Sequence, residues 1–370
     1  MVRRQRGVTN RCLAAVALGC LCGVPTGCGA RATSSRPRAA GASAADALMR
    51  RAGVHAIRAS GVALPFRFFS SLSFWNEPVD AGASLDPGSA EMVAALDATI
   101  ASEQQAGNGP WIDTTSYSVP VYTVSASQPT IRVTLDRYPT PALQSAWSAV
   151  PLPSDAQPSA GTDGDLVIWQ PSTDRLWEFW RAIHEGGNWR AAWGGAMRNT
   201  SSQEGVYGPN TWPGAQPGWG VSASSLSLVG GLITLEDLQL GQINHALAMA
   251  IPEVRARVYS SPAQRTDGTS TNPLSLPEGA HLRLDPNLNL ATLHLPKLTL
   301  MIAEAAQRYG IFITDKGGNV AFYAQDPIPT ASNPYAGPNG YFQGKYPNQL
   351  LATFPWNNLQ LLKTQPHTTR

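Results

Sequence analysis

The chain carries its clearest structural pattern in Asp165-Leu166-Val167-Ile168-Trp169-Gln170-Pro171-Ser172-Thr173-Asp174-Arg175-Leu176-Trp177-Glu178-Phe179-Trp180. Two mainly apolar runs flank four residues of turn chemistry, which predicts a β-hairpin. If those four residues form the loop, Gln170 pairs with Arg175 and the side chains alternate between two faces. Both faces are largely apolar, which is typical of a strand pair inside a sandwich.

Short strands and turn residues dominate the rest of the chain, which contains 34 Gly and 30 Pro. Apolar spacing predicts helices over 89–105 and 295–309. A second hairpin is predicted from strands 311–314 and 320–324 around the turn 315–319. No internal repeat is present. We therefore expect a mainly β protein, an antiparallel β-sandwich of jelly-roll-like type in a single domain with a few packed α-helices.

The N-terminal residues have the layout of a secretory signal. Several Arg precede the apolar run 12–24, and small residues follow it. This run is shorter than the roughly 20 residues that a membrane-spanning helix needs. Pro25-Thr26-Gly27-Cys28 resembles a bacterial lipobox, which predicts a leader over 1–28 and lipidation of Cys28. Cleavage after residue 32 by ordinary signal peptidase is the alternative.

The leader is followed by two further predicted regions. Residues 29–60 are rich in Ala, Ser, Arg and Pro, a composition that predicts a flexible tether. Residues 61–370 form the predicted globular domain. We expect this domain outside the cell or at the cell surface, with membrane contact only through the lipid anchor.

Cysteine content and charge exclude several classes of site. The four cysteines all lie in the predicted leader, so the domain has no disulfide framework and no thiolate metal site. The formal charge of the chain is +2, but residues 1–59 contain ten Arg and one Asp, which leaves −7 for residues 60–370. An acidic domain lacks the basic surface that nucleic-acid binding requires.

The chain resembles a family of secreted proteins from high-GC bacteria. The segments that carry this resemblance are Leu176-Trp177-Glu178-Phe179-Trp180, Gly230-Gly231-Leu232-Ile233, Gly241-Gln242-Ile243-Asn244-His245-Ala246-Leu247, Pro262-Ala263 and Arg283-Leu284. The resemblance implies an exported, single-domain protein. It implies no activity.

The predicted hairpin brings two carboxylates and two indoles to one face. Glu178 lies diagonal to Asp165, and diagonal neighbours are roughly 5.5–8 Å apart. This range overlaps the carboxylate separations of glycoside hydrolases, about 5–5.5 Å or 6.5–9.5 Å. Trp169 and Trp180 would supply flat apolar surfaces for sugar rings. In the alternative interpretation the tryptophans are core residues and Glu178 is paired with Arg190 or Arg198.

His245 is the second catalytic candidate. As a general base it would support a polysaccharide lyase, with Arg283 neutralising a uronate carboxylate and Tyr309 close to the substrate. The alternative is a histidine that is hydrogen-bonded in the core.

Other chemistries have no support in the sequence. The histidines have no metal-ligand spacing, glycine-rich nucleotide loops are missing, and no Gly-x-Ser-x-Gly elbow occurs. We therefore expect neither a metal nor a cofactor. The predicted partner is a polysaccharide or a cell-envelope glycan, on which the protein would act as a glycoside hydrolase. A non-catalytic carbohydrate-binding or structural protein and a lyase centred on His245 are the alternatives.

Overall fold

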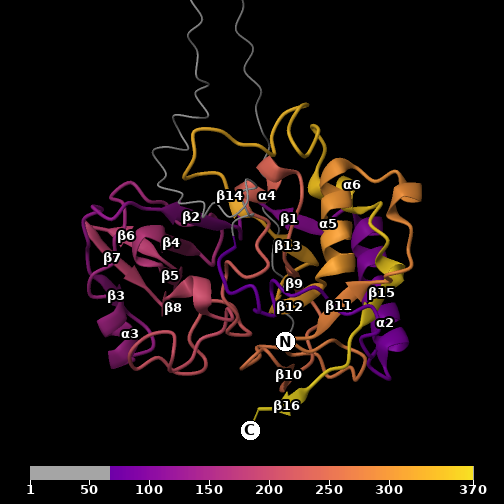
Figure 1. Ribbon diagram of the computed structural model, residues 1–370, viewed down its shortest axis with the longest axis horizontal. Coiled ribbons are helices and arrows are strands. Elements are labelled where there is room, and N and C mark those ends of the chain that lie inside the picture. The colour runs from indigo at the N-terminus through magenta and orange to yellow at the C-terminus, as the bar shows by residue number, and fades with distance from the viewer. Residues whose placement is uncertain (1–66, 370) are drawn as a thin grey trace, which may run out of the picture. The chain divides into compact units, whose positions relative to one another are not determined.

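The hairpin around Pro171–Asp174 forms with the predicted register. In the computed structural model, which describes residues 67–369 (Figure 1), strand β4 (Leu166–Gln170) pairs antiparallel with β5 (Arg175–Trp180). Gln170 lies opposite Arg175, and the 3-10 turn η1 (Pro171–Thr173) closes the loop. Every residue of β4 is buried, which agrees with its two apolar faces.

The N-terminal predictions fall outside this region. The leader over 1–28 with Cys28, the tether over 29–60 and residues 61–66 all lie outside the described residues. The chain divides into the units 1–43 and 44–370, and the described residues all belong to the second unit. Within the described residues, none of the helices combines the length and the apolar character needed to cross a membrane.

The hairpin belongs to a five-stranded sheet. Its strands, in spatial order, are β14 (Gln325–Asp326), β2 (Val119–Thr123), β4, β5 and β8 (Trp193–Arg198). The pairs β14–β2 and β2–β4 are parallel, whereas β4–β5 and β5–β8 are antiparallel. A smaller sheet contains β3 (Val133–Leu135), β7 (Asn188–Ala191) and β6 (Ile183–Glu185).

A six-stranded mixed sheet forms the other half of the described chain, on the right in Figure 1. Its strands, in spatial order, are β1 (Trp111–Asp113), β13 (Ala321–Tyr323), β9 (Leu247–Ile251), β12 (Ile311–Lys316), β11 (His281–Leu284) and β15 (Leu359–Leu361). Strands β10 (Val258–Ser260) and β16 (Pro366–Thr368) pair separately.

The predicted second hairpin is wrong. Strands β12 and β13 exist, but β9 lies between them, parallel to β12 and antiparallel to β13. All five residues of β9 are buried. A strand that is apolar on both faces is stabilised most at the centre of a sheet, and this burial outweighs the local turn signal of 315–319.

Both long helices form as predicted. Helix α2 (Ser89–Ala106) ends at Gly107, whose φ of 70° is left-handed. Helix α5 (Lys297–Arg308) buries Leu298, Met301, Ile302 and Ala305 and packs against β9 and β11. The shorter helical segments are α3 (Pro141–Ala146), α4 (Leu235–Leu240), α6 (Pro347–Leu351), η2 (Thr200–Ser202), η3 (Leu290–Leu293) and η4 (Trp356–Asn358).

The predicted mainly β class is confirmed. The described residues form sixteen strands with few helices, consistent with a β-sandwich. Both large sheets also contain parallel pairs, which the prediction of an antiparallel sandwich did not include. One apolar core surrounds the hairpin and a second surrounds β9, β12 and α5.

A connector segment, residues 221–233, joins the two large sheets. On one side the Leu228 N–H donates to Glu178 Oε1 of β5 at 2.8 Å. On the other side the Ser224 N–H donates to the carbonyl of Thr314 in β12 at 3.1 Å, and Gly231 O accepts from the N–H of Ala248 in β9 at 2.9 Å. The connector segment therefore hydrogen-bonds to strands of both large sheets.

Replacing Gly231 by Ala tests the importance of this connector. Gly231 has a φ of 70°, and an added Cβ would collide with the Leu247–Ala248 backbone and with the Trp75 indole. Strain and overpacking together predict a loss of about 3 kcal/mol in the free energy of unfolding, measured by urea denaturation. Gly208→Ala is the matched control, since a Cβ there meets no atom within 4 Å. Equal losses in the two variants would contradict the argument.

Candidate functional site

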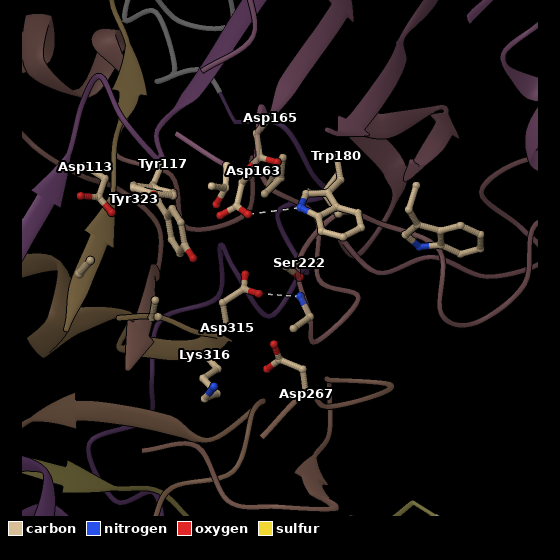
Figure 2. Close-up of a pocket in the computed structure, with 18 of the residues that line it drawn as sticks. Asp113, Tyr117, Asp163, Asp165, Trp180, Ser222, Asp267, Asp315, Lys316 and Tyr323 are labelled. Atoms are coloured by element: carbon tan, nitrogen blue, oxygen red, sulfur yellow. Dashed lines mark hydrogen bonds between the residues drawn. The ribbon is translucent and has the colours of Figure 1, made fainter. Parts of the chain in front are cut away.

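A large cleft lies between the ends of the two large sheets. Its volume is about 1320 Å³. The five-stranded sheet contributes Trp180 and Trp193, and the six-stranded sheet contributes Asp113, Asp315 and Tyr323. Figure 2 shows side chains from both sheets pointing into the same space. The connector segment lines the cleft with Val221, Ser222, Ala223 and Leu228.

Aromatic side chains form much of the cleft wall. They are Trp111, Tyr117, Tyr138, Trp180, Trp193 and Tyr323. Tyr138 packs edge-on against Trp193, with ring centroids 5.9 Å apart. The Trp193 Nε1–H donates to the carbonyl of Gly218 at 3.3 Å, which fixes the indole. Rigid aromatic faces with polar neighbours are suited to sugar rings, which have apolar C–H faces and polar edges.

Five carboxylates share the cleft with these rings. They are Asp113, Asp163, Asp165, Asp267 and Asp315. In Figure 2, Asp163 and Asp165 lie on one side of the cleft, with Asp315 and Asp267 on the opposite side. The cleft therefore offers carboxylates on facing walls, which acid–base chemistry on a bound substrate requires.

Asp165 is the most deeply placed of these carboxylates. Its side chain is 5% exposed, and Oδ1 has no hydrogen-bond partner among the described residues. Burial raises the pKa of Asp165 well above its ordinary value, and the nearby charges of Asp163, Asp315 and Glu178 add to this effect. Asp165 therefore keeps its proton to a higher pH than an ordinary aspartate does, which suits a proton donor.

Asp315 lies at the end of β12, next to a register shift in that strand. Its Oδ1 accepts a hydrogen bond from the Ala223 N–H at 2.7 Å. Burial raises the pKa of Asp315 to about 7, although this hydrogen bond favours the ionised form. Asp315 can therefore gain or lose a proton near neutral pH.

Arg265 supports the position of Asp315 indirectly. Its Nη2 donates to the carbonyls of Gly220 at 3.1 Å and Ser222 at 2.8 Å. These carbonyls flank the start of the connector segment, which carries the Ala223 N–H. Arg265 is thus a positioning residue.

Two more carboxylates line the cleft beside aromatic rings. Asp163 Oδ1 accepts a hydrogen bond from Trp180 Nε1–H at 3.4 Å, drawn as a dashed line in Figure 2. Asp113 ends β1, and burial raises its pKa to about 7. These contacts place acidic groups at the edges of the aromatic walls.

The predicted pair of Asp165 and Glu178 does not meet across the cleft. Asp165 lines it, but Glu178 is fully buried in mid-β5 and does not line it. Glu178 Oε1 accepts hydrogen bonds from the Ser227 hydroxyl and the Leu228 N–H, so its carboxylate points at the connector segment. Burial raises the pKa of Glu178 to about 7.

The alternative ion pairs for Glu178 are wrong. Arg190 instead binds Asp136 at 2.7 Å and Glu185 at 3.3 Å. The guanidinium of Arg198 lies over the Trp212 ring, 5.6 Å from its centroid.

The predicted substrate-binding residues are divided between the cleft and the core. Trp180 lines the cleft. Trp169 is 6% exposed and packs edge-on against Phe68. Arg283 is buried, where it donates to Gln360 and to the carbonyl of Asp80. Tyr309 is a buried core residue. The last three therefore lie away from the cleft.

His245 also lies away from the cleft, in a small cavity beside Asp237. Its Nε2 is 3.1 Å from Asp237 Oδ2, and its Nδ1 is 2.8 Å from the carbonyl oxygen of Ala246. Burial lowers the pKa of His245, but Asp237 outweighs this effect and the pKa is raised overall. Asp237 also caps α4 through Thr234. The pair thus secures the start of that helix.

Most of the cleft carboxylates could not be predicted from the sequence. Asp315 opens the predicted turn 315–319, Asp163 precedes the hairpin, and Asp113 ends a short strand. None carries a motif, because each comes from a different segment and only the pairing of distant strands brings them together. Of the residues that the hairpin pattern indicated, Asp165 and Trp180 line the cleft.

Comparisons with known proteins add no relative. No family model matches the chain, and neither the curated proteins nor the solved structures give a match. Within residues 67–369, no group of three or more His, Cys, Asp or Glu side chains is arranged to hold a metal ion.

The His245–Asp237 pair predicts a specific pH dependence of stability. Since the pKa of His245 is raised in the folded chain, the pair contributes fully below pH about 6.5 and is lost as pH rises through the raised pKa. His245→Asn should cost about 2 kcal/mol of unfolding free energy at low pH and less at high pH. Urea denaturation across the pH range measures this difference.

The matched control is His294→Asn at an exposed, left-handed position that Asn tolerates. It should leave stability unchanged at every pH. A His245→Asn cost that does not shrink as pH rises would contradict the ion-pair argument.

Proposed function

We propose that the chain is an exported protein that acts on polysaccharide, and that the cleft is the active site of a glycoside hydrolase. The observation that carries this proposal is the buried carboxyl of Asp165, unpartnered at Oδ1, which faces other carboxylates in a cleft walled by aromatic rings. Paired carboxyl groups in different protonation states are the usual machinery of glycoside hydrolysis.

Asp165 and Asp315 take the two roles that hydrolysis requires. Asp165 donates its proton to the glycosidic oxygen as the bond from that oxygen to the anomeric carbon breaks. A water oxygen forms the new bond to that carbon and gives its proton to the Asp315 carboxylate. The Ala223 N–H holds that carboxylate in place before the reaction.

The aromatic walls account for substrate binding. Trp180 and Trp193 would stack on sugar rings, while the Asp163 carboxylate is held at the edge of the Trp180 indole. A sugar hydroxyl at that edge would find a hydrogen-bond acceptor. The cleft can accommodate several sugar rings, given its volume of about 1320 Å³.

The lyase alternative has less support than hydrolysis. It required His245 and Arg283 at the substrate, and both are held in structural contacts outside the cleft. A cleft lined by five aspartates would also repel the uronate carboxylates on which such lyases act.

Asp165→Asn tests the hydrolase. The variant keeps the shape of the side chain but cannot donate the carboxyl proton, so kcat should fall about 100- to 10,000-fold while substrate binding persists. The measurement is reducing-end release from β-glucan, xylan, chitosan and polygalacturonate. Wild-type activity should fall at high pH, because Asp165 then loses the proton that it donates, and below about pH 7, because Asp315 then gains a proton and can no longer accept one.

Asp155→Asn, at an exposed loop position that does not line the cleft, is the matched control and should retain full activity. Unchanged release by Asp165→Asn would contradict the assigned acid. Binding without release in the wild type would instead identify a carbohydrate-binding module. If the wild type neither binds nor cleaves any of these polymers, the polysaccharide proposal is contradicted.

Export to the cell surface is part of the same proposal. It rests on the basic and apolar leader, the lipobox-like Cys28 and the resemblance to secreted proteins. Cys28→Ser should abolish lipidation and remove the protein from the membrane fraction of an expressing bacterial host. Mass spectrometry of the N-terminus measures the outcome. A wild-type N-terminus at Thr33 without lipid would favour the alternative cleavage.

A further inference from the structure

We infer that the cleft selects a cationic glycan, a chain of amino sugars with free amino groups, because five aspartates line the substrate space and, among the described residues, none of them forms an ion pair. This inference rests on the proposed function and adds the substrate class to it.

Acidic side chains outnumber basic ones in the cleft. Five aspartates line it, against Arg265 and Lys316 as the cations. The guanidinium of Arg265 donates to the backbone carbonyls of Gly220 and Ser222 and interacts electrostatically with Asp315 and Asp267. Within residues 67–369, the ion pairs join Arg190 to Asp136 and Glu185, and His245 to Asp237, so none involves a carboxylate of the cleft.

Hydrolysis accounts for two of these carboxylates and leaves three. Asp113 and Asp163 lie beside aromatic rings, and Asp267 lies near Asp315 on the opposite wall (Figure 2). Asp113 and Asp163 are half-buried, whereas Asp267 is exposed. A half-buried carboxylate without an ion-pair partner is costly, and a bound ammonium group would relieve that cost. A neutral sugar offers only hydroxyl donors, which form weaker hydrogen bonds to a carboxylate than ammonium does.

One buried group strengthens the case for a polar, cationic ligand. Asp165 lines the cleft, is 5% exposed, and has an Oδ1 without a hydrogen-bond partner among the described residues. Its carboxyl therefore lacks a donor from the chain.

The aromatic walls favour the same ligand. An ammonium group above the face of Trp180 or Trp193 is attracted by the ring quadrupole. The apolar C–H face of the amino sugar stacks on the same surface. Ring stacking and charge attraction therefore act together on one class of polymer.

The test compares three oligosaccharides of matched length and β-1,4 linkage: glucosamine, N-acetylglucosamine and glucose oligomers. Calorimetric affinity for the glucosamine oligomer should exceed that for the other two by about tenfold at low salt, since each ammonium–carboxylate contact adds Coulomb energy. High salt should reduce this preference, because counterions screen the attraction. Reducing-end release from chitosan should likewise exceed release from polymers of N-acetylglucosamine and of glucose.

A variant pair isolates the charge effect. Asp267→Asn should weaken binding of the glucosamine oligomer about fivefold and leave the glucose oligomer unaffected. Glu304→Gln, on the exposed face of α5, makes the same change in charge outside the cleft and should alter neither affinity.

The outcomes separate the two proposals. Equal or tighter binding of the neutral oligomers, with release from them, would overturn the cationic substrate class and leave the hydrolase standing. If the wild type releases reducing ends from none of the polymers, the hydrolase proposal itself is overturned. A glucosamine preference that Asp267→Asn leaves unchanged would also overturn the assignment to these carboxylates.

Discussion

The buried carboxylate of Glu178 holds the connector segment on which the arrangement of the cleft depends. It accepts hydrogen bonds from Ser227 and Leu228, while Ser224 in the same segment donates to Thr314 across the gap. The connector also carries the Ala223 N–H that binds Asp315. Asp315 on the six-stranded sheet and Glu178 on the five-stranded sheet are therefore linked through the connector segment.

Arg265 and Glu178 show how a largely apolar fold supports an acidic cleft. Both hydrogen-bond to the connector segment, Arg265 to the carbonyl of Ser222 and Glu178 to the N–H of Leu228. Arg265 lines the cleft, whereas Glu178 lies behind it. Burial raises the pKa of Asp165 and of Asp315, and this favours their uncharged forms and limits their mutual repulsion.

Local patterns predicted local structure well. The hairpin register, α2 and α5 followed from alternation and helical spacing. The order of strands in the six-stranded sheet did not, because the insertion of β9 between β12 and β13 depends on burial competition among distant segments. The site was predicted only in part for the same reason: Asp165 and Trp180 lie near the hairpin, whereas Asp113 and Asp315 reach the cleft through long-range pairing.

The parallel pairing of β1 with β13, and of β2 with β14, has a consequence for how the chain acquires its structure. Trp111 pairs with Ala321, and Val119 pairs with Gln325. Two strands from the N-terminal part of the described chain therefore pair with strands that lie about 200 residues later in the sequence. Contacts this distant in sequence slow folding, because a long loop must close before either sheet is complete. Neither large sheet can therefore be completed before β13 and β14 have been synthesised.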